Sequence, residues 1–543
     1  MLQRGFLANA SLFLAYTEAA VLPLAPSRGR PRRTQKHVAS WATFDDVIPS
    51  PELKWIDCIG PDRQCAKLTV PLDYENPHAG TTDIAFVRYL FSEDAEDILF
   101  NPGGPGSTGI PFAGPMGPGE AWAKRWGYNF VAFDPRGVGQ TGPDFFCLPT
   151  NNSASPPPSR TNGELGDLTE IWKYKLEYLK KCSEANAHNN ARYIGTSAVV
   201  QDLIHFTELQ AAARGKDPKL ASINYFGISY GTIIGQTLAA MYPKRLRRVL
   251  LNGNVHGPSH YKGWIPNQYD DLSHAISLFT KLCFEAKGEH CALSQGAKSI
   301  ETVKRRFEKA VNMLEKQLVE ICGQPFGSDE FFQVVQSSLY SPKTFTDIDK
   351  YASLILSNET STFTCSTTTT DKVKDLNRSQ NALLLITAAD IAGRYPWRGY
   401  EEWKAAADSL YTRVPHFAEY YATRNGLTGL IDLIPPTSQI FPGFETTNTS
   451  TPILFVSSSG DPVTPVGSAR EMSRLFPGSG LLVVDIPGHP YKDLFSQCGE
   501  KIISEYWNSG VVPAEETWCE TSVSAGTYFP GPAVAVNLTL LGE

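Results

Sequence analysis

Short apolar runs, each bounded by glycine, proline or polar residues, mark the strands that the sequence predicts. Three lie in the first half of the chain, at residues 98–101, 221–226 and 249–251, and two lie near the C-terminus, at residues 452–457 and 481–486. Apolar runs of this length are typical of strands buried inside a sheet. The pattern therefore predicts a sheet whose strands come from both ends of the chain.

The stretch between residues 259 and 440 has a different pattern. Residues 300–321, for example, distribute Lys, Arg and Glu on the period of an amphipathic helix. This stretch interrupts the sheet between the strand at 249–251 and the strand at 452–457. We therefore expect a helical unit inserted into the sheet-forming part of the chain.

The strand predicted at 221–226 runs directly into Gly-Ile-Ser-Tyr-Gly at residues 227–231, and residues 232–241 form an apolar, helix-compatible run. Ser229 therefore falls on a sharp strand-to-helix turn, which is the place of the nucleophile in a G-x-S-x-G elbow. Side chains at positions 227 and 231 would collide with the adjacent strand and helix. A lone match is weak evidence, so the hypothesis depends on the residues around it.

A glycine-rich loop, Pro-Gly-Gly-Pro-Gly at residues 102–106, follows the strand predicted at 98–101. A loop in this place donates one backbone N–H to an oxyanion, and the residue after the nucleophile donates the other. The candidate oxyanion donors are the backbone N–H groups of Gly104 and Tyr230.

An aspartate and a histidine follow the two late strands. Asp461 lies after the strand at 452–457, and His489 lies after the strand at 481–486. The chain order Ser229, Asp461, His489 is that of the α/β-hydrolases and differs from the orders in chymotrypsin and subtilisin. In this hypothesis Ser229 attacks a carbonyl, His489 takes and returns its proton, and Asp461 orients and stabilises the imidazolium.

Two of these assignments have competitors. Asp485 lies four residues before His489, but within a predicted strand and facing away, whereas loops at strand ends carry catalytic groups. We therefore favour Asp461 as the acid. Of the chain's ten histidines, His489 is the one that follows a late strand on a glycine-containing loop.

Residues 104–109 also match the dinucleotide pattern G-x-G-x-x-G. A nucleotide site requires a helix to begin at those glycines, and the prolines and glycines at 111–119 oppose one. The sequence holds no phosphate-binding loop, zinc-binding His-Glu-x-x-His, paired Cys-x-x-Cys or EF-hand pattern, so we expect no metal and no organic cofactor.

The composition, with 543 residues of which 42% are hydrophobic and 19% charged, is that of one large globular enzyme. The formal net charge of −7 argues against nucleic acid as a partner. Outside the N-terminal leader, no stretch approaches the length and apolarity of a membrane span.

Five motifs in chain order resemble those of the tripeptidyl aminopeptidase-like α/β-hydrolases, in the proline iminopeptidase (S33) clan. They are Cys58…Cys65-Ala66 with Val-Pro-Leu-Asp-Tyr at 70–74, Asn-Pro-Gly-Gly-Pro-Gly at 101–106, Asp-Pro-Arg-Gly-Val-Gly at 134–139, Gly-Ile-Ser-Tyr-Gly-Thr at 227–232, and Gly460-Asp461 with Gly488-His489. The resemblance implies an α/β-hydrolase fold, with helices on both faces of a mostly parallel central sheet and an inserted helical lid. It also implies a serine triad that removes short peptides or single residues from free N-termini, and relatives that hydrolyse esters or amides of small metabolites.

The predicted organisation has four parts. They are a leader and basic tail at 1–40, the first part of the hydrolase core at 41–258, the lid at 259–440, and the C-terminal part of the core at 441–543. A lid in that place caps the active site and shapes its specificity.

The ten cysteines suit disulfides better than metal ligation. Cys58 with Cys65, Cys283 with Cys291, and Cys498 with Cys519 are near pairs; for the other four we guess Cys147 with Cys182 and Cys322 with Cys365. Such cysteine usage indicates an oxidising compartment. Glycosylation sequons stand at Asn151, Asn358, Asn377, Asn448 and Asn537.

The leader is apolar over residues 6–25 and follows Arg4, as in a signal peptide, although Asn9, Thr17 and Glu18 interrupt it. The cysteines, rather than this leader, favour a secreted protein, because disulfides form and persist outside the cell.

Three function classes follow. The first is a secreted serine exopeptidase acting on small peptides, which needs an anionic lid group for the substrate ammonium, such as Asp390, Glu401 or Glu402. The second is a hydrolase of small-molecule esters, lactones or amides in a biosynthetic pathway, with the same triad. The third, a binding protein on an inactive hydrolase scaffold, is disfavoured because no triad residue is missing.

Overall fold

The computed structural model describes residues 41–147, 168–363, 370–397, 399–414, 422, 426–489, 496–514, 516–536 and 538. Ten strands form one sheet in the order β1-β2-β3-β5-β4-β6-β7-β10-β11-β12. They are β1 (Ile56–Asp57), β2 (Arg63–Pro71), β3 (Thr81–Tyr89), β4 (Asp97–Asn101), β5 (Asn129–Phe133), β6 (Ile223–Ile228), β7 (Leu246–Asn252), β10 (Ile453–Gly460), β11 (Gly480–Pro487) and β12 (Thr517–Glu520). The five apolar runs of the sequence correspond to β4, β6, β7, β10 and β11.

The sheet is antiparallel from β1 through β3 to β5 and parallel from there to β12. The chain crosses over once among the early strands, so that β5 lies between β3 and β4. This order, with helices on both faces, is the α/β-hydrolase fold that the motifs predict. The carboxyl ends of β4, β6, β7, β10 and β11 therefore meet at one edge of the sheet.

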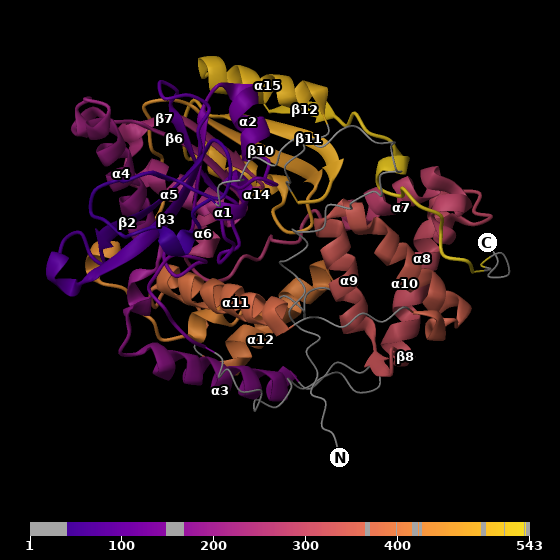
Figure 1. The fold of residues 1–543 in the computed structure, drawn as a ribbon. Helices are drawn as coiled ribbons and strands as arrows, with labels where there is room; N and C mark the ends of the chain where they lie inside the picture. The colour runs from indigo at the N-terminus through magenta and orange to yellow at the C-terminus, as the bar shows by residue number, and fades with distance from the viewer. Residues whose placement is uncertain are drawn as a thin grey trace, which may run out of the picture.

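The core helices are α1 (Ile110–Ala113), α2 (Gly119–Trp126), α3 (Leu168–Asn186), α4 (Thr196–Ala213), α5 (Tyr230–Met241), α14 (Val466–Arg474) and α15 (Gln497–Ser509). Between β7 and β10 lie α6 (Gly257–His260), α7 (Leu272–His290), α8 (Ile300–Lys316), α9 (Ser328–Tyr340), α10 (Phe345–Ser357), α11 (Thr370–Ile391) and α12 (Tyr400–Arg413). In Figure 1, α7 to α10 gather beside the sheet, and α12 lies beside α3. The domain boundaries at 258 and 440 stay a prediction.

Buried strands explain why the apolar runs are continuous rather than alternating. In β10, Ile453 and Phe455 join one hydrophobic core, and Leu454 and Val456 join the core on the opposite face. Successive side chains of a strand point to opposite faces, so a strand covered on both sides needs apolar residues throughout. Trp122 of α2 and Trp507 of α15 belong to the same face as Leu454.

Two helix predictions were wrong in part. The amphipathic helix ends at Lys316, because Val319–Ile321 forms β8 and pairs with β9 (Gln324–Phe326). The residues between these strands, Cys322 and Gly323, both have positive φ, as a tight hairpin turn requires.

A one-turn helix, α1, also begins directly after Gly109, where the sequence opposed a helix. Pro111 is tolerated there because the first turn of a helix leaves its N–H groups unpaired anyway.

Four of the guessed disulfides are present, namely Cys58–Cys65, Cys147–Cys182, Cys283–Cys291 and Cys498–Cys519. The predicted pairing of Cys322 with Cys365 is not described, because Cys365 lies outside the described residues. The leader and the sequons at Asn151 and Asn537 also lie outside them. Asn358 and Asn448 are exposed. Among the described residues, no helix combines the length and apolar character needed to cross a membrane.

Candidate active site

Ser229 lies between β6 and α5 on a strained backbone, with φ 57° and ψ −125°. The two flanking glycines are required sterically. A Cβ on Gly227 would lie 2.2 Å from the carbonyl oxygen of Gly231, and a Cβ on Gly231 would lie 2.5 Å from that of Asn101. The strand–turn–helix geometry expected of an elbow is therefore present, with Ser229 9% exposed.

Asp461 and His489 come together at the same edge of the sheet. Asp461 follows β10 and His489 follows β11, and the two side chains join through a 2.8 Å hydrogen bond between Nδ1 of His489 and Oδ2 of Asp461. Both residues are buried. A proton on Nδ1 leaves Nε2 as the basic nitrogen, and Nε2 is buried with no hydrogen-bond partner among the described residues. Ser229 is thus not hydrogen-bonded to His489 here, although catalytic contacts often tighten only when substrate binds.

The carboxylate of Asp461 is held on both oxygens. Oδ1 accepts the backbone N–H groups of Val463, at 2.9 Å, and Thr464, at 2.8 Å. Oδ2 accepts the hydroxyl of Thr464 in addition to the histidine. This turn fixes the carboxylate so that one oxygen faces His489.

The competing acid, Asp485, is elsewhere. It is exposed on β11, and its Oδ1 accepts the hydroxyl of Ser459 at 2.6 Å. Its neighbours in the strand, Val484 and Ile486, are buried on the other face. The alternation along the strand points Asp485 away from His489.

The glycine-rich loop packs directly against the elbow. A Cβ on Gly103 would lie 2.7 Å from Cβ of Ser229 and 3.0 Å from the backbone nitrogen of Tyr230. Gly103 and Gly104 both have φ of 105°, which a side chain would strain. Tyr230 is the first residue of α5, so its N–H has no acceptor within the helix. The two candidate oxyanion donors therefore belong to adjoining segments.

Comparison with known proteins now adds to the geometry. Residues 433–519 match the model of the TAP-like protein family. The chain is 24% identical over 490 residues to a tripeptidyl aminopeptidase of Streptomyces lividans, covering 86% of each protein. It is 25% identical over 498 residues to the serine protease Hip1 of Mycobacterium tuberculosis H37Rv, covering 86% of this chain and 91% of that protein. In these comparisons the chain is similar to TAP-like proteins, and its strand order is that of an α/β-hydrolase.

Among solved structures, the chain overlaps a serine hydrolase of Cycloclasticus zankles at 13% identity and a TM-score of 0.32, over 82% of this chain and 99% of that one. The strand order, rather than this low overlap, carries the fold assignment. With relatives named as a peptidase and a serine protease, the enzyme class is a serine hydrolase.

Asp134 braces the loop that continues from the oxyanion candidate Gly104. Its Oδ1 accepts the hydroxyl of Thr108 at 2.5 Å and the N–H of Gly109 at 2.8 Å, and its Oδ2 accepts the N–H of Gln140 at 2.9 Å. The side chain is fully buried, and that burial raises the pKa of Asp134. The Asp-Pro-Arg-Gly-Val-Gly motif at 134–139 thus helps to hold the loop next to the site in place.

We expect Asp134→Asn to lower the free energy of unfolding by about 1–3 kcal/mol, because the amide NH₂ would face a backbone donor. Denaturant midpoints measure this. Asp83→Asn is the matched control, since half-buried Asp83 accepts only the hydroxyl of Thr69, which can also accept. Equal losses in both variants would contradict the bracing role.

Two neighbours of the site were missed from the sequence. The ring of Tyr340, at the end of α9, packs against the ring of His489 with centroids 4.5 Å apart and a tilt of 33°, and the Tyr340 carbonyl accepts the N–H of His489 at 3.1 Å. Thr196, at the start of α4, bonds to the phenol of Tyr230 at 2.6 Å. No local sequence pattern indicates either contact, because each contact joins segments that are far apart in the chain.

The anionic groups suggested for a substrate ammonium lie on α11 and α12. Asp390 is 3% exposed, and its oxygens accept two hydrogen bonds from Thr196 and one from His260. Glu401 and Glu402 lie in the exposed first turn of α12. The carboxylate of Asp390 thus already has three hydrogen-bond donors inside the protein, and an ammonium anchor among these groups stays a prediction.

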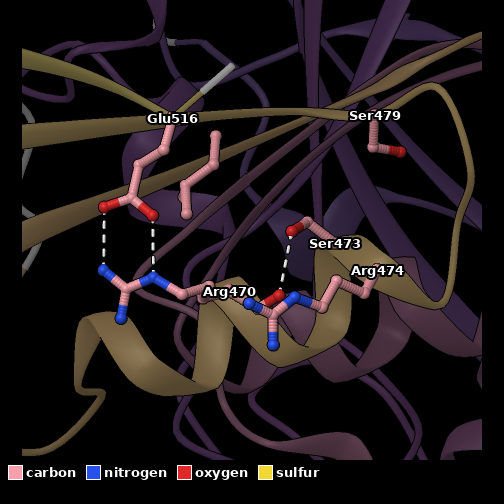
Figure 2. A pocket seen from close by; sticks show the side chains of 6 residues that line it. Arg470, Ser473, Arg474, Ser479 and Glu516 are labelled. Carbon is pink, nitrogen blue, oxygen red and sulfur yellow. Dashed lines mark hydrogen bonds and ion pairs between the residues drawn. The ribbon is translucent and has the colours of Figure 1, made fainter.

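Two other features of the described chain lie outside this site. Cys283, Cys291 and Asp349 cluster closely, but the two sulfurs form a disulfide and cannot act as thiolate ligands. Figure 2 shows a surface pocket of about 230 Å³, where Arg470 pairs with both oxygens of Glu516 at 2.7 Å. Ser479 and Leu481 line it at the amino end of β11, whereas His489 follows the carboxyl end.

Proposed function

We propose that Ser229, His489 and Asp461 form the catalytic triad of this hydrolase. The observation that carries the proposal is the buried hydrogen bond between Asp461 and His489, at the edge of the sheet where the elbow presents Ser229. Nε2 of His489 takes the proton of the Ser229 hydroxyl as its oxygen attacks the substrate carbonyl, and then gives that proton to the leaving amine. Water repeats the cycle on the acyl-enzyme and frees the serine.

The backbone N–H groups of Gly104 and Tyr230 stabilise the oxyanion in this proposal. Their support is the packing of Gly103 against Ser229 and the place of Tyr230 at the first turn of α5. Donors that are fixed before the reaction stabilise the developing charge without reorganising, which is usually a large part of catalysis.

We propose further that the substrate is a peptide with a free N-terminus, from which the enzyme removes short peptides or single residues. The support is the similarity, over most of both chains, to a protein named a tripeptidyl aminopeptidase. A lid formed by the insertion between β7 and β10, with α9 packed on His489, suits an enzyme that admits chain ends. The four disulfides support an extracellular place of action, and exposed Asn358 and Asn448 can accept glycans there.

The test is hydrolysis of short chromogenic peptide amides, each with a free and with an acetylated N-terminus, and with Ser229→Ala as the blank. We expect acetylation to lower kcat/KM by at least about 100-fold, because it removes the positive charge that an exopeptidase recognises at a free N-terminus.

Equal cleavage of both forms would contradict the exopeptidase proposal. Cleavage of neither form, by protein that a serine-directed phosphonate still labels, would favour the hydrolase of small esters, lactones or amides.

A further inference from the structure

We propose that one face of helix α11 forms the support of the oxyanion hole, with Asp390 and Ser379 as positioning residues for the two donor segments. The inference rests on the proposed function, because it concerns the Gly104 and Tyr230 donors. It adds that a helix of the insertion, and not only the sheet, sets how well those donors are aligned.

The first contact runs from Asp390 to the residue after the nucleophile. The carboxylate accepts the backbone N–H of Thr196 on Oδ1 and the Thr196 hydroxyl on Oδ2, both at 2.6 Å. Since that hydroxyl donates to Asp390, its oxygen accepts from the phenol of Tyr230, 2.6 Å away. Burial raises the pKa of Tyr230 well above its usual value, so the phenol stays protonated and donates.

This relay is sealed from solvent. Asp390 is 3% exposed, Thr196 0%, Tyr230 2% and His260 6%. His260 closes the far side of Asp390, with Nε2 at 2.8 Å from Oδ2. A buried carboxylate with three hydrogen-bond donors has one preferred geometry, because any other orientation would leave a buried donor or acceptor unpaired.

The second contact joins α11 to the oxyanion loop. The hydroxyl of Ser379 donates to the carbonyl of Gly106 at 2.9 Å. A Cβ on Gly106 would lie 2.4 Å from the carbonyl of Ser379 and 3.0 Å from Cβ of Ala382. The loop backbone thus lies directly on the helix, two residues after Gly104.

The two contacts share one face of α11. Ser379 and Asp390 are eleven residues apart, which is close to three whole turns and about 16 Å along the axis. A shift of the helix would therefore move the Gly104 segment and the Tyr230 segment together. Because a misplacement of about 1 Å in a catalytic constellation can cost about 100-fold in rate, such a shift should appear in kcat.

The decisive variant is Thr196→Val, which removes the hydroxyl and keeps the shape and the backbone N–H. We expect kcat to fall about 10- to 100-fold with KM changed less than about threefold, and Thr196→Ser to restore most of the rate. Tyr230→Phe breaks the same link from the other end. Since both variants cut one relay, the double variant should be no slower than the slower single variant.

Thr207→Val is the matched control. Thr207 lies eleven residues after Thr196 on α4, and its hydroxyl donates to the carbonyl of Leu203 at 2.7 Å. We expect this variant to keep the wild-type rate, because its hydroxyl bonds within its own helix. Ser379→Ala, at a half-buried position, tests the second contact, with an expected decrease in kcat of about threefold.

The rate of labelling by a serine-directed phosphonate separates the possible failures. If wild-type protein is not labelled at Ser229, the triad proposal fails and this inference falls with it. Suppose instead that wild type is labelled, that Thr196→Val and Tyr230→Phe are labelled at the wild-type rate, and that both variants keep the wild-type kcat. The triad proposal then stands, and the positioning role is overturned. Slower labelling of folded Thr196→Val or Tyr230→Phe, with Thr207→Val unaffected, supports it.

Discussion

Replacing Ser229 with alanine is expected to lower kcat by about 10⁶-fold and to leave the fold intact. The loss is large because water must then attack the substrate without an activated nucleophile. What remains is the contribution of the oxyanion donors and of substrate binding. Stability should change little, since the strained backbone at Ser229, with φ 57°, is equally strained for alanine.

Steady-state turnover of the best peptide amide, together with thermal unfolding, measures both parts of this expectation. Ser457→Ala is the matched control, because Ser457 is buried on β10 and its hydroxyl has no hydrogen-bond partner among the described residues. That variant should keep wild-type activity. Activity of Ser229→Ala within about tenfold of wild type would end the serine mechanism.

The parts of the fold that the sequence predicted are those with local causes. A strand buried on both faces must be apolar along its length, so β4, β6, β7, β10 and β11 were visible as runs. The elbow was visible because sterics demand glycine at 227 and 231. Near cysteine pairs predicted the short-range disulfides, since chain connectivity already brings such residues together.

The parts that escaped prediction have non-local causes. The place of β5 between β3 and β4 depends on pairing between distant segments, which no local period encodes. The helix at 300–321 was extended too far because Val319 and Ile321 fit a helical face as well as a hairpin. The contacts of Tyr340 with His489, and of Asp390 with Thr196, join the insertion to the core. Only the folded chain brings these residues together.

Asp461→Asn is expected to lower kcat by about 10⁴-fold, with the protein still folded. The reason lies in the turn at 461–464. The backbone N–H groups of Val463 and Thr464 require an acceptor, so the amide oxygen of the asparagine must take the place of Oδ1. Its NH₂ group then faces Nδ1 of His489, which must accept instead of donate. The histidine proton moves to Nε2, and Nε2 can no longer act as the base.

The same substitution at the competing carboxylate is the control for this tautomer argument. Asp485→Asn should keep kcat within about twofold of wild type, because the exposed side chain contacts Ser459 and not His489. Pre-steady-state acylation of the two variants by an activated ester measures the step in which Nε2 accepts the proton. If Asp485→Asn were the slow variant and Asp461→Asn the active one, the acid would be Asp485 and the hydrogen bond at 2.8 Å between Asp461 and His489 would be only structural. The buried position of Asp461, its three hydrogen-bond donors besides the histidine, and its place after β10 all favour the opposite result.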